Sequence, residues 1–218
     1  MNFITDPVEI EKRSFEIISR QLEEKPVDVR NANVIKRVIH TSADFDYADN
    51  LVFSEGVVDA AISAIKNGLK IVTDTQMARA GINKKAAESL ACMIHCFIDA
   101  PEVVAEAQSK GVTRAWAAVD HATATLEPPV IFAVGNAPTA LIRLHELVTS
   151  NVLTPTLIIA APVGFVNVTE SKELILGLHI PYIVARGRKG GSNVAAAICN
   201  ALFYETIERS LNDNGTTN

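Results

Sequence analysis

The chain has 218 residues, of which 48% are hydrophobic and 21% are charged. These proportions exclude a disordered tail, a collagen-like repeat and a minimal disulfide-stapled scaffold. A compact chain of this length buries about 70% of its unfolded surface, so it can build a full core without metal or disulfide staples. The formal net charge of -5 argues against a protein that coats nucleic acid, since counterion release requires a broad basic face. Any anionic ligand must therefore meet a local basic cluster.

The amino-terminal segment predicts a helix. Asp6 can cap it, Pro7 suits its first turn, and isoleucines recur behind them near helical spacing. Pro26 is expected to end this helix. A second helical pattern runs over about residues 27–39 and leads to a polar loop that opens at His40.

From Gly56 onward, helical segments alternate with short, continuous apolar runs that are often β-branched, as strands covered on both faces tend to be. The expected strands are 69–73, 92–98, 130–134, 157–160 and 182–185. The expected helices between and after them are 102–110, 114–126, 140–148, 170–176 and 194–211. This alternation predicts an α/β fold with three α/β/α layers and a mostly parallel, doubly wound sheet.

No repeat or linker interrupts the chain before its polar tail, so we expect one domain over residues 1–218, with 1–5 and 212–218 flexible. The first residues lack a basic leader, and the longest apolar run is broken by Pro162 and Gly164. That run falls short of the ~20 residues that span a bilayer. Three cysteines favour reduced thiols over a disulfide framework. We therefore expect a cytoplasmic protein without a membrane partner.

In open parallel sheets, ligands bind outside the carboxyl ends of the strands. Four segments follow predicted strands there, and we call them the strand-end rim: 74–81, 135–139, 161–165 and 186–193. Segment 186–192 holds three cations, three glycines and a capping residue before a helix, so it can bind a carboxylate or phosphate through N–H groups, helix dipole and charge. A solvated basic turn is the alternative. The segment matches neither a Walker A loop nor a dinucleotide fingerprint.

Two histidines are candidates for chemistry. His95 lies between Cys92 and Cys96, but on a strand it would point away from both thiols, so a plain core strand is favoured and no metal site is expected. His40 closes a helix and opens a polar loop, where an imidazole can act as a general acid near neutral pH. A histidine held there by the helix dipole is an equally good interpretation. No G-x-S-x-G segment supports acyl transfer.

Several strings of residues occur in a specific order between about Asp6 and Ala201. They are EKRSF at 11–15, VIH at 38–40, DTQM at 74–77, GNAPTAL at 135–141, PVGFV at 162–166, ESK at 170–172 and RGRKGGS at 186–192. Together they resemble the precorrin-8X methylmutase (precorrin isomerase, cobalt-precorrin-8 methylmutase) family of cobalamin biosynthesis. The resemblance implies an isomerase that moves a methyl group from C-11 to C-12 of a corrin-type macrocycle in a 1,5-sigmatropic shift.

The same resemblance implies a homodimer whose subunits share active sites, and no separate cofactor, since any cobalt is carried by the substrate. It assigns the catalytic role to His40 and binding roles to Arg13, Ser14 and Arg114. The loop around Thr75 and Arg79 departs from some members of the family. With the strand-end rim included, the candidate substrate-binding residues are Arg13, Ser14, Thr41, Asp74, Thr75, Met77, Arg79, Arg114, Asn136, Val163, Phe165, Arg186, Arg188, Lys189, Gly190 and Gly191.

A corrin-type substrate carries acetate and propionate groups around a large apolar ring, so its site must combine apolar surface with cations at the edge. The strand-end rim offers both. Two other functions stay open at this point: a tetrapyrrole carrier without catalysis, and a doubly wound enzyme that binds a nucleotide phosphate at 187–192.

Overall fold

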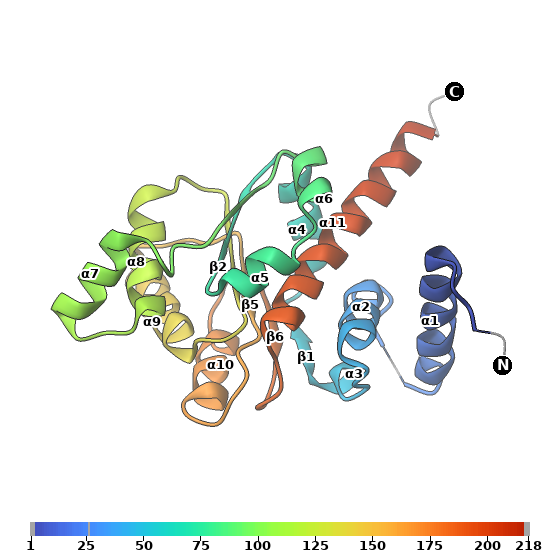
Figure 1. Ribbon diagram of the computed structural model, residues 1–218, viewed down its shortest axis with the longest axis horizontal. Coiled ribbons are helices and arrows are strands. Elements are labelled where there is room, and N and C mark those ends of the chain that lie inside the picture. The colour runs from blue at the N-terminus through green and yellow to red at the C-terminus, as the bar shows by residue number, and fades with distance from the viewer. Residues whose placement is uncertain (1–2, 26, 216–218) are drawn as a thin grey trace.

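A six-stranded sheet lies at the centre of the computed structural model, which describes residues 3–25 and 27–215 (Figure 1). Its strands are β1 (Leu51–Phe53), β2 (Lys70–Thr73), β3 (Met93–His95), β4 (Val130–Val134), β5 (Leu157–Ala160) and β6 (Tyr182–Ala185). Their order is β1-β6-β5-β4-β2-β3, and every neighbouring pair is parallel except β1 with β6. The predicted mostly parallel sheet is confirmed. The sequence did not predict β1, because three residues are too few to show a pattern.

One face of the sheet is covered by α2 (Ala32–Ser42), α4 (Val57–Lys66) and α11 (Ser192–Gly215), with α3 (Tyr47–Asn50), α5 (Gln76–Gly81) and α6 (Lys84–Ser89) beside them. The other face is covered by α8 (Arg114–Thr125), α9 (Pro138–Thr149) and α10 (Val168–Leu176), and α7 (Pro101–Lys110) packs outside α8. Alternate residues of β4 point to opposite faces of the sheet. Ile131 packs in the core on the α2, α4 and α11 face, and Phe132 packs in the core on the α8, α9 and α10 face. The three-layer arrangement predicted from the alternation is therefore confirmed.

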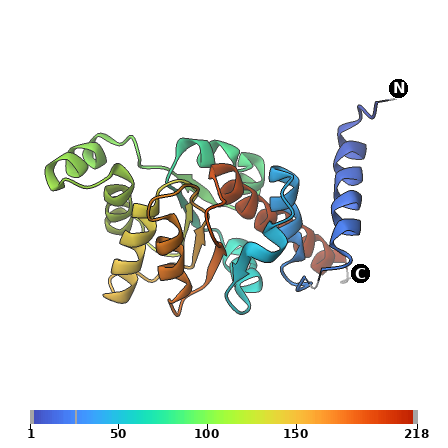
Figure 2. The same ribbon diagram turned by 90° about the horizontal axis from the view of Figure 1, so that it is seen from below.

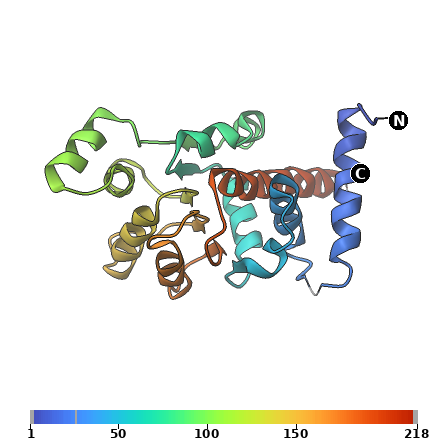
Figure 3. The same cartoon turned by 60° about the horizontal axis from the view of Figure 1, so that its bottom comes forward.

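Helix α1 (Pro7–Leu22) stands at one end of the molecule, beyond α2, and α7 lies at the other end (Figures 2 and 3). The side chain of Asp6 accepts a hydrogen bond from the Glu9 N–H, which confirms the predicted cap. Helix α1 buries Ile18 and Leu22 but leaves Ile17 exposed. Much of its apolar surface is therefore uncovered in the single chain.

Most predicted bounds differ from the structure by a few residues, and three differences matter most. Helix α2 begins at Ala32 rather than 27, because Asp28 accepts the backbone N–H of Arg30 in a local turn that precedes the helix. Helix α11 continues to Gly215, so residues 212–215 are helical rather than a tail. Strand β3 is a short edge strand in which Met93 is 52% exposed, not a core strand. Pro26 and the outermost residues at each end lie outside the described residues.

Candidate active site

Asp74, directly after β2, organises the centre of the strand-end rim. It is only 7% exposed, and its two carboxylate oxygens accept the backbone N–H groups of Gly135, Asn136 and Ala137 at 2.7 to 2.8 Å. Burial raises the pKa of Asp74, and the three N–H bonds act in the opposite direction. The geometry favours Asp74 as a support for the turn after β4, which leaves the Asn136 side chain exposed at the surface.

Two close contacts join the rim segments to one another. The Thr75 and Ser192 hydroxyl groups lie 2.7 Å apart, which links the segment after β2 to the start of α11. The N–H of Gly191 donates to the carbonyl oxygen of Ala161 at 2.8 Å. A Cβ atom on Gly190 would lie 2.3 Å from that same oxygen, so only glycine allows this approach. The glycines of segment 186–192 thus serve close backbone packing.

The three cations of segment 186–192 differ in their partners. Arg186 makes a bidentate ion pair with Glu173 at 2.8 and 3.1 Å. Arg188 lies over the ring of Phe165, 5.8 Å from its centroid, and has no carboxylate partner among the residues that the structure describes. The expected cluster of three available cations is therefore reduced, because α10 supplies a carboxylate to Arg186.

The third cation, Lys189, binds two carboxylates from the loop that follows α2. Its ammonium lies 2.6 Å from both Asp44 and Asp46, and these hydrogen bonds raise the pKa of Lys189. That loop follows His40 and Thr41, which are exposed in the last turn of α2. Lys189 thus connects the strand-end rim to the candidate catalytic histidine.

His40 ends a column of stacked planar groups from three helices. Its imidazole stacks on the Phe15 ring of α1, with centroids 5.2 Å apart and planes 16° apart. The guanidinium of Arg37 lies 4.6 Å from the centroid of Phe15 and 4.9 Å from that of Tyr204 on α11. The column fixes α1 beside His40, and sequence reasoning did not identify Phe15, Arg37 or Tyr204 as its members.

Arg13 and Ser14 precede Phe15 on α1. Arg13 pairs with Glu16 at 2.9 Å, and the Ser14 hydroxyl donates to the carbonyl oxygen of Ile10 at 2.8 Å. Both candidates therefore lie on the element that contacts His40, and each has a partner within α1.

Asp99 lies outside the four rim segments and connects the rim to Arg114. Its carboxylate accepts hydrogen bonds from Arg114 at 3.0 Å and from the Gln76 amide at 3.4 Å. Met77, next to Gln76, is 72% exposed. Arg79 instead lines a pocket of about 170 Å³ beside the β3 edge, together with Lys84, Ala87, Glu88, Cys92 and Ile94. Arg114 is thus joined to the rim, whereas Arg79 points toward the β3 edge.

Exposed apolar side chains lie on the segment after β5. Phe165 is 84% exposed and Val163 is 48% exposed. The rim therefore presents apolar surface beside Arg188, as a large apolar ring with acidic substituents requires.

A buried lysine that sequence reasoning missed supports segment 186–192 of the rim. Lys172 on α10 is 0% exposed, and its ammonium donates to the carbonyl oxygens of Gly187 and Lys189 at 2.8 Å each. Burial lowers the pKa of Lys172 to about 8. The signal was present, because Lys172 lies on the same helical stripe as the buried Val168 and Ile175.

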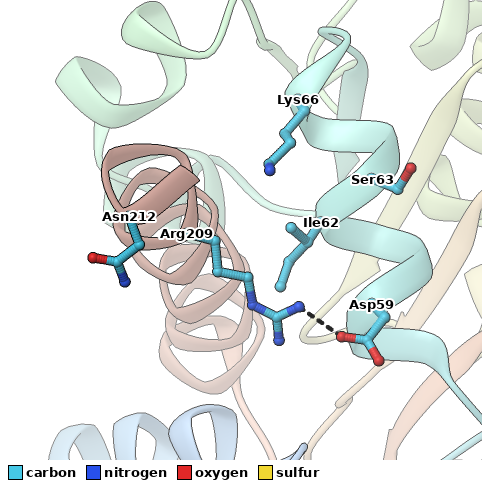
Figure 4. A pocket seen from close by; sticks show the side chains of 6 residues that line it. All are labelled: Asp59, Ile62, Ser63, Lys66, Arg209 and Asn212. Carbon is cyan, nitrogen blue, oxygen red and sulfur yellow. Dashed lines mark hydrogen bonds and ion pairs between the residues drawn. The ribbon is translucent and has the colours of Figure 1, made fainter. Parts of the chain in front are cut away.

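A pocket of about 400 Å³ lies away from the rim, between α4 and the far part of α11 (Figure 4). It is lined by Asp59, Ile62, Ser63, Lys66, Arg209 and Asn212, with Arg209 bound to Asp59 at 2.7 Å. None of its lining residues belongs to the strand-end rim or to the His40 column, so we place the candidate site at the rim. In the described part of the chain, no three His, Cys, Asp or Glu side chains are grouped to hold a metal ion. No helix found there is long and apolar enough to cross a bilayer.

Comparisons with known proteins all identify the same family. The precorrin-8X methylmutase family model matches residues 9–205. The cobalt-precorrin-8 methylmutase of Salmonella typhimurium is 46% identical over 215 residues, which cover 95% of this chain and 100% of the relative. That of Leptospira interrogans is 38% identical and covers 92% and 94%.

The fold agrees with that family. The crystal structure of precorrin-8X methylmutase from Thermus thermophilus superimposes with a TM-score of 0.85 at 35% identity, and covers 92% of this chain and 98% of that one. The matched residues include His40, Lys172 and the whole strand-end rim. The chain belongs to the precorrin-8X methylmutase family.

Proposed function

We propose that this protein catalyses the methylmutase reaction of cobalamin biosynthesis, in which a methyl group moves from C-11 to C-12 of precorrin-8X or cobalt-precorrin-8. The product is hydrogenobyrinate or its cobalt-containing counterpart, cobyrinate. The observation that carries the proposal is the family match over residues 9–205, which contains both His40 and the strand-end rim. We further propose that no separate cofactor takes part and that any cobalt belongs to the substrate.

A suprafacial 1,5-shift is allowed by orbital symmetry and needs no nucleophile. The protein must hold one tautomer of the ring and donate a proton or hydrogen bond to a ring nitrogen as the π electrons rearrange. His40 is exposed at the end of α2 and is held by its stack on Phe15, so its imidazole is available as that donor. General acid assistance of this kind contributes ~10²- to 10⁴-fold.

The rim is the proposed binding surface for the macrocycle. Met77, Val163 and Phe165 offer exposed apolar area to the ring. Arg188 is proposed to receive a carboxylate at its edge. Arg114 stays a prediction, because Asp99 already binds it at 3.0 Å. The remaining candidates, Arg13, Ser14, Thr41, Asp74, Thr75, Arg79, Asn136, Arg186, Lys189, Gly190 and Gly191, stay predictions, with Asp74, Gly190 and Gly191 favoured as supports for the rim.

We propose a cytoplasmic homodimer. Its support is the uncovered surface at the amino-terminal end, where Phe3, Val8 and Ile17 are exposed. A shallow, open hollow runs along α1 and is lined by Lys12, Phe15, Glu16, Ser19, Arg20 and Glu23. One helix cannot enclose such a hollow, and a second copy of the chain can close it beside the His40 column.

Absorbance spectroscopy tests the proposed function. The protein is mixed with precorrin-8X, and we expect the bound chromophore to change its spectrum with time to that of hydrogenobyrinate. A bound spectrum that stays constant would indicate a carrier instead. Absence of chromophore binding, together with a nucleotide-induced rise in melting temperature, would indicate nucleotide-phosphate binding at 187–192.

A further inference from the structure

Lys172 is a charged group held inside the protein without a carboxylate partner. Its side chain is fully buried on α10, and the only partners found among the described residues are the carbonyl oxygens of Gly187 and Lys189. The neighbouring Glu173 is already engaged by Arg186. A buried ammonium without a counterion is costly, and an apolar residue of similar size would fill the same space at lower cost. Packing alone therefore does not explain Lys172.

The two carbonyl groups that Lys172 binds flank Arg188 on both sides. The carbonyl oxygen of Arg188 itself accepts the N–H of Gly164 at 3.2 Å. Three consecutive carbonyl groups are thus turned inward and satisfied, and Gly187 adopts a φ of +79° that glycine accepts readily. With its backbone held in this way, Arg188 carries its exposed side chain to the ring of Phe165, 5.8 Å from the centroid.

Arg188 is also the cation of this segment that has no acidic partner in the part of the chain described. Arg186 binds Glu173, and Lys189 binds Asp44 and Asp46. A guanidinium without an acidic partner can present its planar N–H groups to a carboxylate in bidentate geometry. The exposed ring of Phe165 has its centroid 5.8 Å from this guanidinium, so the pair can receive an acidic substituent of an apolar ring.

We propose that Lys172 is a positioning residue that holds Arg188 over Phe165 as a subsite for one side-chain carboxylate of the macrocycle. The inference rests on the proposed function and names how one part of its substrate is recognised. Lys172 acts through the backbone on either side of Arg188 and does not contact the ligand. Its lowered pKa, about 8, agrees with a site in which no acidic group offsets the charge.

A double-mutant cycle in the full-length protein tests this coupling. The ligand is hydrogenobyrinate, and the variants are Lys172→Met, Arg188→Gln and the double variant. We expect each single change to weaken binding about tenfold or more, as loss of a charge-assisted pair does, and Lys172→Met to add less than twofold when Arg188→Gln is present. Hydrogenobyrinate with all of its carboxylates methylated cannot form this ion pair with Arg188, so it is expected to bind Lys172→Met and wild type equally. Lys85→Met, an exposed lysine on α6, is the matched control and should bind as wild type does.

Two further measurements keep the test decisive. Amide hydrogen exchange of residues 187–191 should be faster in Lys172→Met than in wild type, without any ligand. If that variant does not fold, Lys172→Gln retains N–H donors on a shorter side chain and should show an intermediate binding loss that again vanishes with Arg188→Gln. Additive losses of affinity in the cycle, or unchanged hydrogen exchange of residues 187–191, would overturn the role of Lys172 and leave the proposed function standing. Failure of the wild-type protein to bind any corrinoid would overturn the proposed function and the subsite with it.

Discussion

The ammonium of Lys189 lies 2.6 Å from the carboxylate of Asp44, although the two residues are 145 positions apart in the sequence. The contact joins the loop after α2 to the loop between β6 and α11. His40 lies four positions before Asp44, so this ion pair links the segment that follows the candidate catalytic residue to the strand-end rim. Lys189 thereby connects the loop after α2 to the loop before α11, in addition to the substrate contact predicted for it.

Replacing both Asp44 and Asp46 by Asn removes both carboxylate partners of Lys189 and should separate the effect of this contact on stability from its effect on activity. Both pairs are exposed to solvent, which screens them, so we expect the free energy of unfolding to change little. We expect kcat to fall about three- to tenfold, because His40 is no longer held at a constant distance from the rim. Urea denaturation and steady-state kinetics measure the two quantities. Asp28→Asn, which breaks an exposed pair with Arg30, is the control, and an equal kcat in both variants would contradict the prediction.

The His40→Ala variant should bind the macrocycle within a few-fold of wild type but isomerise it ~10²- to 10⁴-fold more slowly in a single turnover. The reason is that the proton donor is lost while the rim stays intact. His179→Ala removes an exposed imidazole from a turn before β6 and should leave the rate unchanged. An unaltered single-turnover rate in His40→Ala would reject the catalytic assignment.

Phe15→Leu should lower kcat about three- to tenfold, which is the rate equivalent of losing one aromatic pair, with little change in KM. Without the ring 5.2 Å away, the imidazole of His40 can rotate out of its productive orientation. Phe15→Tyr keeps the ring and should retain activity. The comparison is made by single-turnover absorbance, and equal losses in the Leu and Tyr variants would show that the stack does not orient His40.

Two glycines in one loop distinguish close packing from backbone conformation. A Cβ atom at Gly190 would lie 2.3 and 2.5 Å from the carbonyl oxygens of Ala161 and Pro162, so Gly190→Ala must displace the loop. We expect it to lower the free energy of unfolding by about 2 to 3 kcal/mol and to weaken corrinoid binding. Gly187→Ala meets no atom within 4 Å and strains only its φ of +79°, at about 1 kcal/mol. Equal unfolding midpoints for the two variants would contradict this account.

The buried Lys172 should make stability depend on pH. Its folded-state pKa of about 8 lies below the ordinary value of 10.5, so between these values the unfolded state binds more protons than the folded state. The free energy of unfolding therefore rises with pH from about 8 to 10.5, by a total on the order of 3 kcal/mol. Denaturation of wild type and Lys172→Met from pH 7 to 10.5 measures the difference between them. A difference that stays constant with pH would show that Lys172 titrates normally.

The sequence alone predicted the elements whose signals are local. Asp6 and Pro7 predicted the start of α1 because a cap and its first turn involve only neighbouring residues. Strands β4, β5 and β6 have their predicted bounds, because strands buried on both faces read as unbroken apolar runs. The alternation of strands and helices then predicted the parallel sheet, and the ordered strings of residues predicted the family.

Only the tertiary structure decided how those parts meet. It gave β1 its antiparallel partner and engaged both oxygens of Asp74 with the turn after β4. It bound two of the three cations of segment 186–192 to carboxylates on other elements. It also placed Lys172 beneath Arg188 and Phe15 against His40. A sequence reports what each residue can do from its type and its neighbours. Which partner satisfies a charge or a carbonyl group depends on segments that come together when both faces of the sheet are buried.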